Sequence, residues 1–464
     1  MNYDVLIVGG GPGGYVSAIR MKQYGLNVAV IEKERLGGVC LNWGCIPTKS
    51  LVKVAELFKE IKEADKFGIS VSEAKINYQS IWQRKNEVVE QLVSGVEFIF
   101  KKREIPNLKE TVKTINRREK DYLIETENNK YTAKYIVLAT GSKPKTLPFM
   151  KFNGTTIMSS RDILNMNDLP EHLVIIGGGV IGCEFASIFN HFGVNVEIVE
   201  FLPHLISTED QEISKRLAMS LKKVKIKIQL NTGVEGFQEQ KGKLILELSS
   251  GKTIETDKVL LSVGREAQMD IKFPGKELKT ENGFVTTDKE FRTNLPDLFA
   301  IGDVTGTMML AHVASKQGLI VADIIANEVK STGIDILELN YAAVPACTYT
   351  DPEIASVGIS QQEAEKLNKK IVIGKFPFSA NGKSLGLGNR FGFVKLIAEE
   401  DSGKIIGMHI IGPQATELIA QGAYMIGTNM TFNEIKKIIF AHPTLSECIM
   451  EAAEDLENKA VHII

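Results

Sequence analysis

The chain has 464 residues, about three times the roughly 150 that one domain usually takes, so two to four domains are expected. Its content of 44% hydrophobic and 24% charged residues excludes disordered and collagen-like chains. The 55 Lys and Arg nearly balance the 57 Asp and Glu, and the net charge of −2 offers no positive field for nucleic acid or an anionic membrane. No apolar run reaches the roughly 18 residues of a membrane-spanning helix, and no targeting signal begins the chain, so we expect a cytoplasmic protein.

A glycine-rich turn follows the first apolar run of the chain. Residues 5–8 predict a strand, residues 15–24 have helical spacing, and residues 28–31 predict a second strand. The marker residues of this pattern are Gly9, Gly11, Gly14 and Glu32. Such a pattern is typical of a dinucleotide-binding unit, in which a pyrophosphate faces the helix N-terminus and the carboxylate binds a ribose.

The same pattern recurs 168 positions later, with apolar runs at residues 173–176 and 195–199. Its marker residues are Gly177, Gly179, Gly182 and Glu200. One glycine motif has many structural causes, but two copies at one offset predict two dinucleotide-binding units. Residues 201–206 contain no Lys or Arg that could hold a 2′-phosphate, so the second unit is predicted to prefer NAD over NADP. Two sites suggest one tightly held redox cofactor and one diffusing nicotinamide.

Two of the five cysteines, Cys40 and Cys45, lie close together after the first unit. Residues 51–61 have helical spacing, which predicts Cys45 at or just before a helix N-terminus, where a thiolate is favoured. A structural disulfide across so short a loop would stabilise the chain little, and zinc would lack further ligands because the other cysteines are isolated. We therefore favour a redox-active dithiol, for which a flavin is the natural bridge to a nicotinamide.

Seven blocks of sequence together resemble the flavin disulfide reductases, and among these the branch that oxidises dihydrolipoamide. The blocks are GGGPGGY (9–15), GGVCLNWGCIPTK (37–49), ATGS (139–142), GGGVIGCE (177–184), GR (264–265), AIGD (300–303) and AHPTLSE (441–447). The resemblance implies FAD in the first unit and NAD in the second. It also implies an α/β fold with two Rossmann-like dinucleotide-binding domains and a C-terminal α+β interface domain.

The resemblance further implies how the domains divide the chain. A discontinuous FAD-binding domain would take residues 1–145 and 271–340, an NAD-binding domain residues 146–270, and an interface or dimerisation domain residues 341–464. We expect a homodimer with its active site across the interface. The expected partner is a lipoyl-bearing protein of a 2-oxo acid dehydrogenase or glycine cleavage complex, and neither nucleic acid nor a membrane is expected.

Residue by residue, the resemblance assigns Glu32 to the adenosine ribose of FAD, Asp303 to the ribityl chain, Lys49 to the flavin ring, and Glu184 to the nicotinamide and to Lys49. Alone, Asp303 could be a turn aspartate, and Lys49 and Glu184 could be solvated charges. The full FAD set is Gly9, Gly11, Gly14, Glu32, Lys49, Thr140, Gly141, Ser142, Asp303 and Ala311. The full NAD set is Gly177, Gly179, Gly182, Glu184, Glu200 and Gly264. No metal ligand is predicted.

A base for the dithiol substrate is the remaining requirement. A single histidine is usually structural, but imidazole, with a pKa of about 6.5, suits this proton transfer, and Glu447 could orient the ring of His442. The resemblance assigns this pair that role, on the partner's Cys40 and Cys45. The other six histidines are expected to lack comparable partners, and the mixed charges of residues 56–63 are expected to form a solvated helix face.

The predicted reaction oxidises protein-bound dihydrolipoamide. By the resemblance, Cys40 exchanges with the substrate, Cys45 passes electrons to FAD, and NAD is the final acceptor. One alternative is a glutathione reductase-like NAD(P)H enzyme, although it would call for cations after Glu200. The other is a non-catalytic docking subunit of a multienzyme complex.

Overall fold

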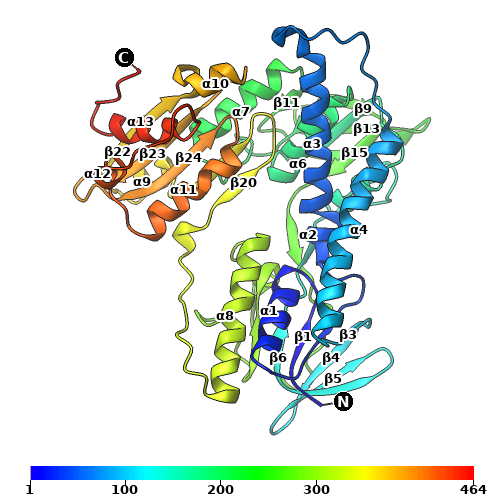
Figure 1. Cartoon of the computed structure of the whole chain (residues 1–464). Coiled ribbons are helices and arrows are strands. Elements are labelled where there is room, and N and C mark those ends of the chain that lie inside the picture. The colour runs from blue at the N-terminus through cyan, green and yellow to red at the C-terminus, as the bar shows by residue number, and fades with distance from the viewer. Residues whose placement is uncertain (1, 464) are drawn as a thin grey trace. The chain divides into compact units, whose positions relative to one another are not determined.

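The computed structural model describes residues 2–463, which form two compact units (Figure 1). The first unit contains the described residues up to Leu51, then Tyr78–Lys145 and Gly264–Leu339. The second contains Val52–Asn77, Thr146–Val263 and the described residues from Asn340 onward. The boundary at Leu51 falls within one helix, α3 (Cys45–Lys62).

The first unit is built on a seven-stranded sheet of order β3-β2-β1-β6-β5-β4, in which β19 also pairs with β6. Five strands run parallel: β1 (Asn2–Val8), β2 (Val28–Ile31), β3 (Asn107–Leu108), β6 (Lys130–Leu138) and β19 (Leu298–Ala300). The antiparallel strands are β4 (Val112–Arg117) and β5 (Tyr122–Thr126). Val8 pairs with Leu138, so the turns that follow β1 and β6 lie at one edge of the sheet.

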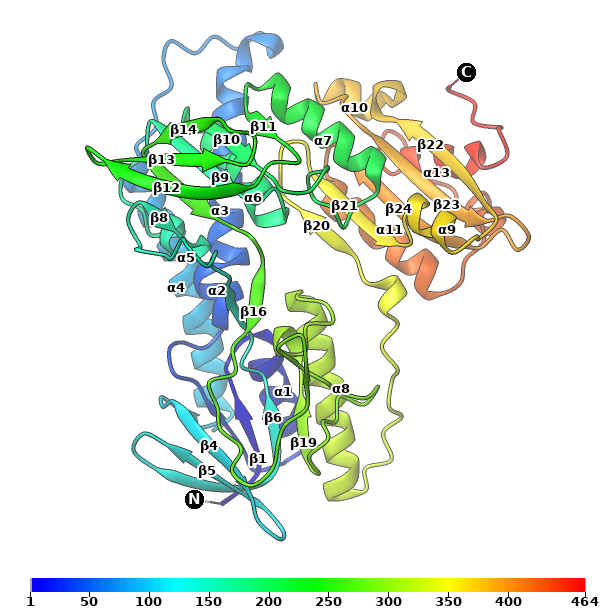
Figure 2. The same ribbon diagram turned by 180° about the vertical axis from the view of Figure 1, so that it is seen from behind.

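The strands of this sheet are apolar on both sides, and helices cover one face while strands and connecting segments cover the other. Val5 and Ile7 belong to one core cluster, and Leu6 and Val8 to another, as the alternation of a strand requires. The helices are α1 (Pro12–Gln23), α2 (Gly38–Trp43), α4 (Tyr78–Lys102) and α8 (Ala311–Lys330). α1 packs along α8, as both views show (Figure 2). The two helices can approach closely because Gly318 has no side chain: a Cβ there would lie only 2.5 Å from the Gly13 carbonyl oxygen.

The second unit contains a parallel sheet of order β11-β10-β9-β15-β8. Its strands are β8 (Ile157–Met158), β9 (His172–Ile176), β10 (Asn195–Val199), β11 (Lys227–Gln229) and β15 (Lys258–Leu261). The associated helices are α5 (Ser160–Leu164), α6 (Val180–His191) and α7 (Gln211–Lys223). An antiparallel sheet adds β12 (Val234–Gln240), β13 (Lys243–Leu248) and β14 (Thr253–Thr256).

An antiparallel sheet of order β20-β21-β24-β23-β22 forms the C-terminal part of the second unit. Its strands are β20 (Ala346–Thr348), β21 (Ile354–Gly358), β22 (Ile371–Pro377), β23 (Phe393–Glu399) and β24 (Ile405–Ile411). The helices α11 (Ala415–Gly427) and α13 (Glu447–Asp455) pack on this sheet. Shorter helices are α9 (Gln361–Lys366), α10 (Gly382–Gly386) and α12 (Phe432–Ile435).

The remaining elements are short. Two small antiparallel pairs join β7 (Ser142–Pro144) to β16 (Arg265–Ala267) and β17 (Thr280–Glu281) to β18 (Phe284–Val285). The 3-10 turns are η1 (Ala64–Phe67), η2 (Gly302–Thr305), η3 (Tyr341–Ala343) and η4 (Phe378–Ala380).

The strand, turn and helix pattern predicted around each glycine motif is confirmed by β1-α1-β2 and by β9-α6-β10. The predicted helix start at Cys45 is also confirmed. The division into domains at residues 1–145 with 271–340, 146–270 and 341–464 stays a prediction. None of the described helices combines the length and apolar character that crossing a membrane requires.

Candidate active site

The two glycine turns have the same geometry. Gly9 and Gly177 have φ values of +105° and +107°, which side chains rarely adopt, and a Cβ on either would lie within 2.4 Å of a carbonyl oxygen just beyond the neighbouring strand. A Cβ at Gly14 or Gly182 would lie 1.9 or 2.0 Å from the carbonyl oxygen of the first glycine in its own turn. Glycine is therefore required at both positions for the helix to pack against the strand.

The middle glycine of each turn faces open space instead. A Cβ at Gly11 would come no closer than 3.9 Å to another atom, and one at Gly179 would meet nothing within 4 Å. Each is the N-cap residue of its helix and provides no capping side chain, which leaves backbone N–H groups in the first turn of α6, and those that follow Pro12 in α1, available to an anion. The open space and these donors suit the pyrophosphate of a dinucleotide.

The acidic residue that ends the second strand is held by the turn in both units. Glu32 accepts the N–H of Gly10 at 2.7 Å and the N–H two positions after itself at 2.8 Å. Glu200 accepts the N–H of Gly178 at 2.5 Å and, likewise, the N–H two positions on at 2.7 Å. Each carboxylate oxygen keeps further acceptor capacity, which is what two ribose hydroxyls require.

Cys40 and Cys45 lie in the first unit, on α2 and at the first residue of α3. Neither sulfur belongs to a disulfide in the structure, and both side chains are partly buried. The hydrogen bond to Cys45 and burial raise the pKa of the Cys40 thiol far above its usual range, although the charge of Lys49 opposes this shift. Hydrogen-bonded sulfurs of this kind are placed to form or open a disulfide.

A polar cluster connects the segment after β6 with η2. Arg265 donates to the hydroxyl oxygen of Ser142 at 2.7 Å and to its carbonyl oxygen at 2.8 Å. The Ser142 hydroxyl donates to Asp303, whose carboxylate lies 3.9 Å from the guanidinium. Burial lowers the pKa of Arg265, and Asp303 and Cys45 oppose that shift, so its charge also lies within electrostatic reach of the dithiol. The GR block contained this arginine, but sequence reasoning gave it no role.

The other predicted FAD residues lie in the same unit. Thr140 and Gly141 follow β6, and a Cβ at Gly141 would meet nothing within 4 Å. Ala311 is the first residue of α8, and Lys49 lies one turn after Cys45 on α3. These positions, together with Gly11, Glu32 and Asp303, provide backbone donors, open space and acceptors that fit FAD.

The predicted NAD residues divide between the units. Glu184 lies on α6 of the second unit, where it is only 4% exposed and accepts the N–H of Tyr349 at 2.9 Å. Gly264, in contrast, belongs to the first unit, where its carbonyl oxygen accepts the N–H of Lys145 at 3.0 Å. Their assignment to the nicotinamide nucleotide stays a prediction.

His442 and Glu447 meet in the second unit just before and at the start of α13. The Nδ1 atom of His442 lies 2.9 Å from Glu447 Oε1, while the N–H of Thr444 donates to Oε2 at 2.8 Å. Burial works against ionisation of Glu447, but these two hydrogen bonds lower its pKa below the usual value. The His442 side chain is 79% exposed, so Nε2 remains available to a substrate while a carboxylate orients the ring.

The expectation that the other histidines lack such partners was wrong. The Nδ1 atom of His462 lies 2.7 Å from Glu451, and His191 Nε2 lies 3.0 Å from Asp351. The expectation that residues 56–63 form a solvated helix face was wrong for Lys59, because its ammonium group binds the Asp351 carboxylate at 2.5 Å. Tertiary packing forms the contacts of Asp351, so no local spacing reveals them.

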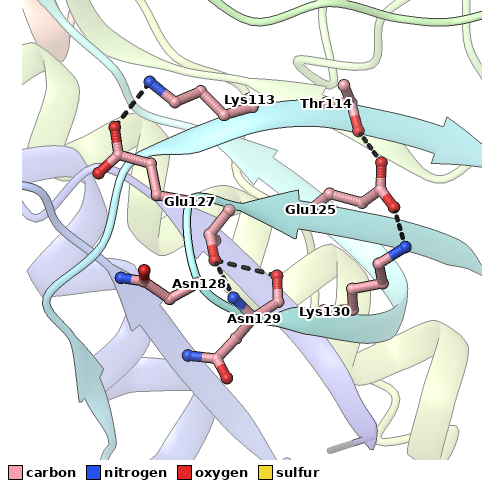
Figure 3. Close-up of a pocket in the computed structure, with 8 residues that line it drawn as sticks. Lys113, Thr114, Glu125, Glu127, Asn128, Asn129 and Lys130 are labelled. Atoms are coloured by element: carbon pink, nitrogen blue, oxygen red, sulfur yellow. Dashed lines mark hydrogen bonds and ion pairs between the residues drawn. The ribbon is translucent and has the colours of Figure 1, made fainter.

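One surface hollow of about 310 Å³ lies at the β4–β5 hairpin (Figure 3). Its charges are satisfied internally, since Lys113 pairs with Glu127 at 2.8 Å and Lys130 with Glu125 at 2.6 Å. None of the predicted site residues lines it. Among residues 2–463, no group of three His, Cys, Asp or Glu side chains could hold a metal ion.

Comparison with known proteins identifies two family regions. Residues 3–318 match the pyridine nucleotide-disulphide oxidoreductases, and residues 344–453 match the dimerisation domain of these proteins. The chain is 39% identical to a dihydrolipoyl dehydrogenase of Bacillus subtilis (strain 168), over 99% of both chains. It is 37% identical to a dihydrolipoyl dehydrogenase of Chlamydia pneumoniae, over 99% of this chain and 98% of the relative.

Solved structures give the same result. LpdA of Mycobacterium tuberculosis matches 97% of this chain and 99% of its own with a TM-score of 0.88 and 25% identity. The HOCl-induced flavoprotein disulfide reductase RclA of Escherichia coli, as a Cu(II) complex, matches 98% of this chain and 99% of its own with a TM-score of 0.85 and 25% identity. The two glycine turns, the dithiol and a family match over most of the chain agree, and the chain belongs to the pyridine nucleotide-disulphide oxidoreductases.

Proposed function

We propose that this chain is a dihydrolipoyl dehydrogenase, which oxidises protein-bound dihydrolipoamide to lipoamide and reduces NAD. The observation that carries the proposal is the hydrogen bond between Cys40 on α2 and Cys45 at the start of α3, in a chain similar to dihydrolipoyl dehydrogenases over almost its whole length. The enzyme uses FAD and NAD. The absence of Lys or Arg from residues 201–206 supports NAD rather than NADP.

The first chemical steps use His442, Glu447 and the two cysteines. Nε2 of His442 takes a proton from one thiol of dihydrolipoamide, and Glu447 stabilises the imidazolium that forms. The substrate thiolate attacks Cys40 of the oxidised pair, which forms a mixed disulfide and releases Cys45 as a thiolate. The second substrate thiol then displaces Cys40, so that lipoamide leaves oxidised and the two cysteines remain reduced.

Bound FAD supplies a two-electron carrier between the reduced cysteines and NAD. We assign it to the first unit, where Gly9 and Gly14 form the tight turn, Gly11 leaves room for the pyrophosphate and Glu32 accepts from the ribose. The remaining assigned FAD residues are Lys49, Thr140, Gly141, Ser142, Asp303 and Ala311. We assign NAD to Gly177, Gly179, Gly182, Glu184, Glu200 and Gly264.

The match to the family's dimerisation domain supports a homodimer. We propose that His442 of one subunit serves the cysteines of the other, which its high exposure supports, and that a separate lipoyl-bearing protein presents the substrate. We retain the division into an FAD-binding domain (1–145 and 271–340), an NAD-binding domain (146–270) and an interface domain (341–464).

Anaerobic reduction of NAD by dihydrolipoamide tests the proposal, with NADP and with glutathione disulfide plus NADPH as parallel reactions. We expect rapid NAD reduction that Cys45→Ser abolishes and that His442→Ala slows by about 100-fold or more. Cys347→Ser and His462→Gln are the matched controls, since neither residue has an assigned role. Activity only with NADPH and another disulfide would instead support a glutathione reductase-like enzyme. A purified protein without flavin would support a docking subunit.

A further inference from the structure

The segment that follows β20 attaches to one face of α6. The N–H of Tyr349 donates to the carboxylate of Glu184 at 2.9 Å, and the N–H of Asp351 donates to the hydroxyl oxygen of Ser187 at 3.0 Å. Nε2 of His191 lies 3.0 Å from the Asp351 carboxylate. The three α6 residues are spaced by three and four positions, so they form one stripe along two turns of the helix.

Asp351 also joins this segment to α3. The oxygen that faces His191 accepts a hydrogen bond from the ammonium group of Lys59 at 2.5 Å, and none of the three side chains is more than 34% exposed. Burial alone would disfavour the charge, but the His191 hydrogen bond and the Lys59 charge lower the pKa of Asp351 to about 2. The carboxylate is therefore ionised under working conditions and holds two elements of the same unit at once.

The polar stripe is particular to the second unit. The positions of α1 that lie 168 residues before Glu184, Ser187 and His191 are Val16, Ile19 and Gln23. Ile19 packs against the apolar core of its unit. The strand, turn and helix of a dinucleotide-binding unit therefore form without this polar stripe. Its presence on α6 calls for an explanation other than folding.

We propose that Asp351 is a positioning residue for the nicotinamide site: by binding His191 and Lys59 it holds the Tyr349 N–H against Glu184 and so fixes the direction of the Glu184 carboxylate. This inference rests on the proposed function, which assigns Glu184 to the nicotinamide. A carboxylate beside a nicotinamide must be held in one rotamer, because a small displacement weakens both binding and hydride transfer. The partly buried Tyr349 N–H provides that restraint, and Asp351 restrains this N–H.

The variant Asp351→Asn of the FAD-loaded enzyme provides the test. The amide keeps the shape of the side chain but loses the charge that Lys59 and His191 bind. We expect the KM for NAD and the Kd for NADH in equilibrium titration to rise roughly tenfold, the cost of one charge-assisted hydrogen bond. The KM for dihydrolipoamide and the flavin absorption spectrum should stay unchanged. Asp351→Glu should restore part of the affinity.

Glu353→Gln is the matched control, because Glu353 lies two positions on and binds Thr416 at 2.8 and 2.9 Å rather than α6. Should Asp351→Asn fold poorly, Lys59→Met removes only the contact with α3 and should give the same shift to a smaller extent. The proposal would be overturned if the KM for NAD and the KM for dihydrolipoamide rose equally. A lower melting temperature with an unchanged Kd for NADH would overturn it as well. NADH titration and NADH-dependent ferricyanide reduction need no dihydrolipoamide, so they keep their meaning even if the proposed substrate is wrong.

Discussion

The two glycine-turn units share their backbone design but differ in what holds their helices. In the first, α1 is fixed by apolar packing, by a close glycine contact with α8, and by a hydrogen bond of 2.7 Å from the Tyr24 hydroxyl at its C-terminal end to Asp323 of α8. In the second, the polar segment from Tyr349 to Asp351 binds a buried side of α6 that carries Glu184. A side chain that these contacts hold in place before a nucleotide arrives lowers the ordering cost of each binding event, which matters most at a site whose nucleotide binds and leaves in every turnover.

The repeated fold keeps the features that every dinucleotide needs separate from the features that differ between the two units. The glycines and Glu32 or Glu200 recur because every dinucleotide needs space for its pyrophosphate and an acceptor for its ribose. The side of the helix that carries Glu184 and Ser187, or Val16 and Ile19 in the first unit, is not subject to that requirement. Residues on this side of the helix can therefore differ between a unit that keeps its cofactor bound and a unit whose nucleotide exchanges.

Alanine at the third glycine of each turn is the strongest test of this comparison. A Cβ at Gly14 or Gly182 would lie 1.9 or 2.0 Å from a backbone oxygen, which the turn cannot accommodate without moving its helix. We expect Gly14→Ala to yield protein without FAD. Gly182→Ala should keep FAD but lose NAD reduction by about 100-fold or more. Flavin absorbance per chain and NAD-dependent turnover measure the two effects, and loss of flavin in both variants would contradict separate sites.

Replacement of the ribose carboxylates should give a smaller, matched pair of effects. Glu32→Gln and Glu200→Gln each lose the charge and one acceptor that now bind two backbone N–H groups. We expect Glu200→Gln to raise the KM for NAD roughly tenfold or somewhat more and to narrow the preference for NAD over NADP. Glu32→Gln should instead increase the fraction of FAD lost on dialysis, with the KM for NAD unchanged. A reversed pattern would exchange the two cofactor assignments.

These two predictions rest on features that the sequence alone could supply. Sequence patterns predict the turn glycines, the acidic strand ends and the cysteine pair because the chemistry of these residues is local. Each acts through its own backbone or through residues a few positions away. His442 and Glu447 are likewise five positions apart and were predicted as a pair. The position of Cys45 at a helix start followed from the spacing of the apolar residues after it.

Contacts between residues far apart in the sequence were not predicted. Lys59 and Asp351 are 292 positions apart, and nothing in the helical pattern around Lys59 distinguishes a solvated charge from a buried ion pair. Arg265 belongs to the GR block of residues 264–265, but its contacts with Ser142 and Asp303 depend on the pairing of β7 with β16. One signal was available: alignment of the two units at 168 positions already sets Glu184 and Ser187 against Val16 and Ile19.

Changes on this helical stripe should have modest and separable effects. Ser187→Ala removes the acceptor of the Asp351 N–H, and we expect the KM for NAD to rise about three- to fivefold, as for one neutral hydrogen bond. At the matching position of the first unit, Ile19→Ala should lower the melting temperature by a few degrees, with no change in that KM, because it removes only apolar packing. Steady-state kinetics and calorimetry distinguish the outcomes, and an unchanged KM in Ser187→Ala would argue that α6 is held without this contact.

The pH dependence of stability should also distinguish the two units. In the second unit, burial raises the pKa of Glu209 to about 7, although Ser356 donates a hydrogen bond to it at 3.0 Å and lowers the value. Asp210 and Glu363 raise it further, and Glu209 Oε2 has no hydrogen-bond partner among the described residues. At the corresponding position, 168 residues earlier, the first unit has the apolar Leu41.

A carboxyl group whose pKa is higher in the folded chain binds its proton more tightly there than in the unfolded chain. Its contribution to the free energy of unfolding is therefore complete below a pH of about 4.5 and is lost as the pH rises through about 7. Glu209→Gln removes this titration, so the variant should lose less stability than the wild type between pH 5 and 8, by roughly 3 kcal/mol at most. Melting temperatures across this pH range check the result. Parallel curves for the two proteins would mean that Glu209 is charged in the fold, and the second unit would then carry one more buried ion than its first-unit counterpart.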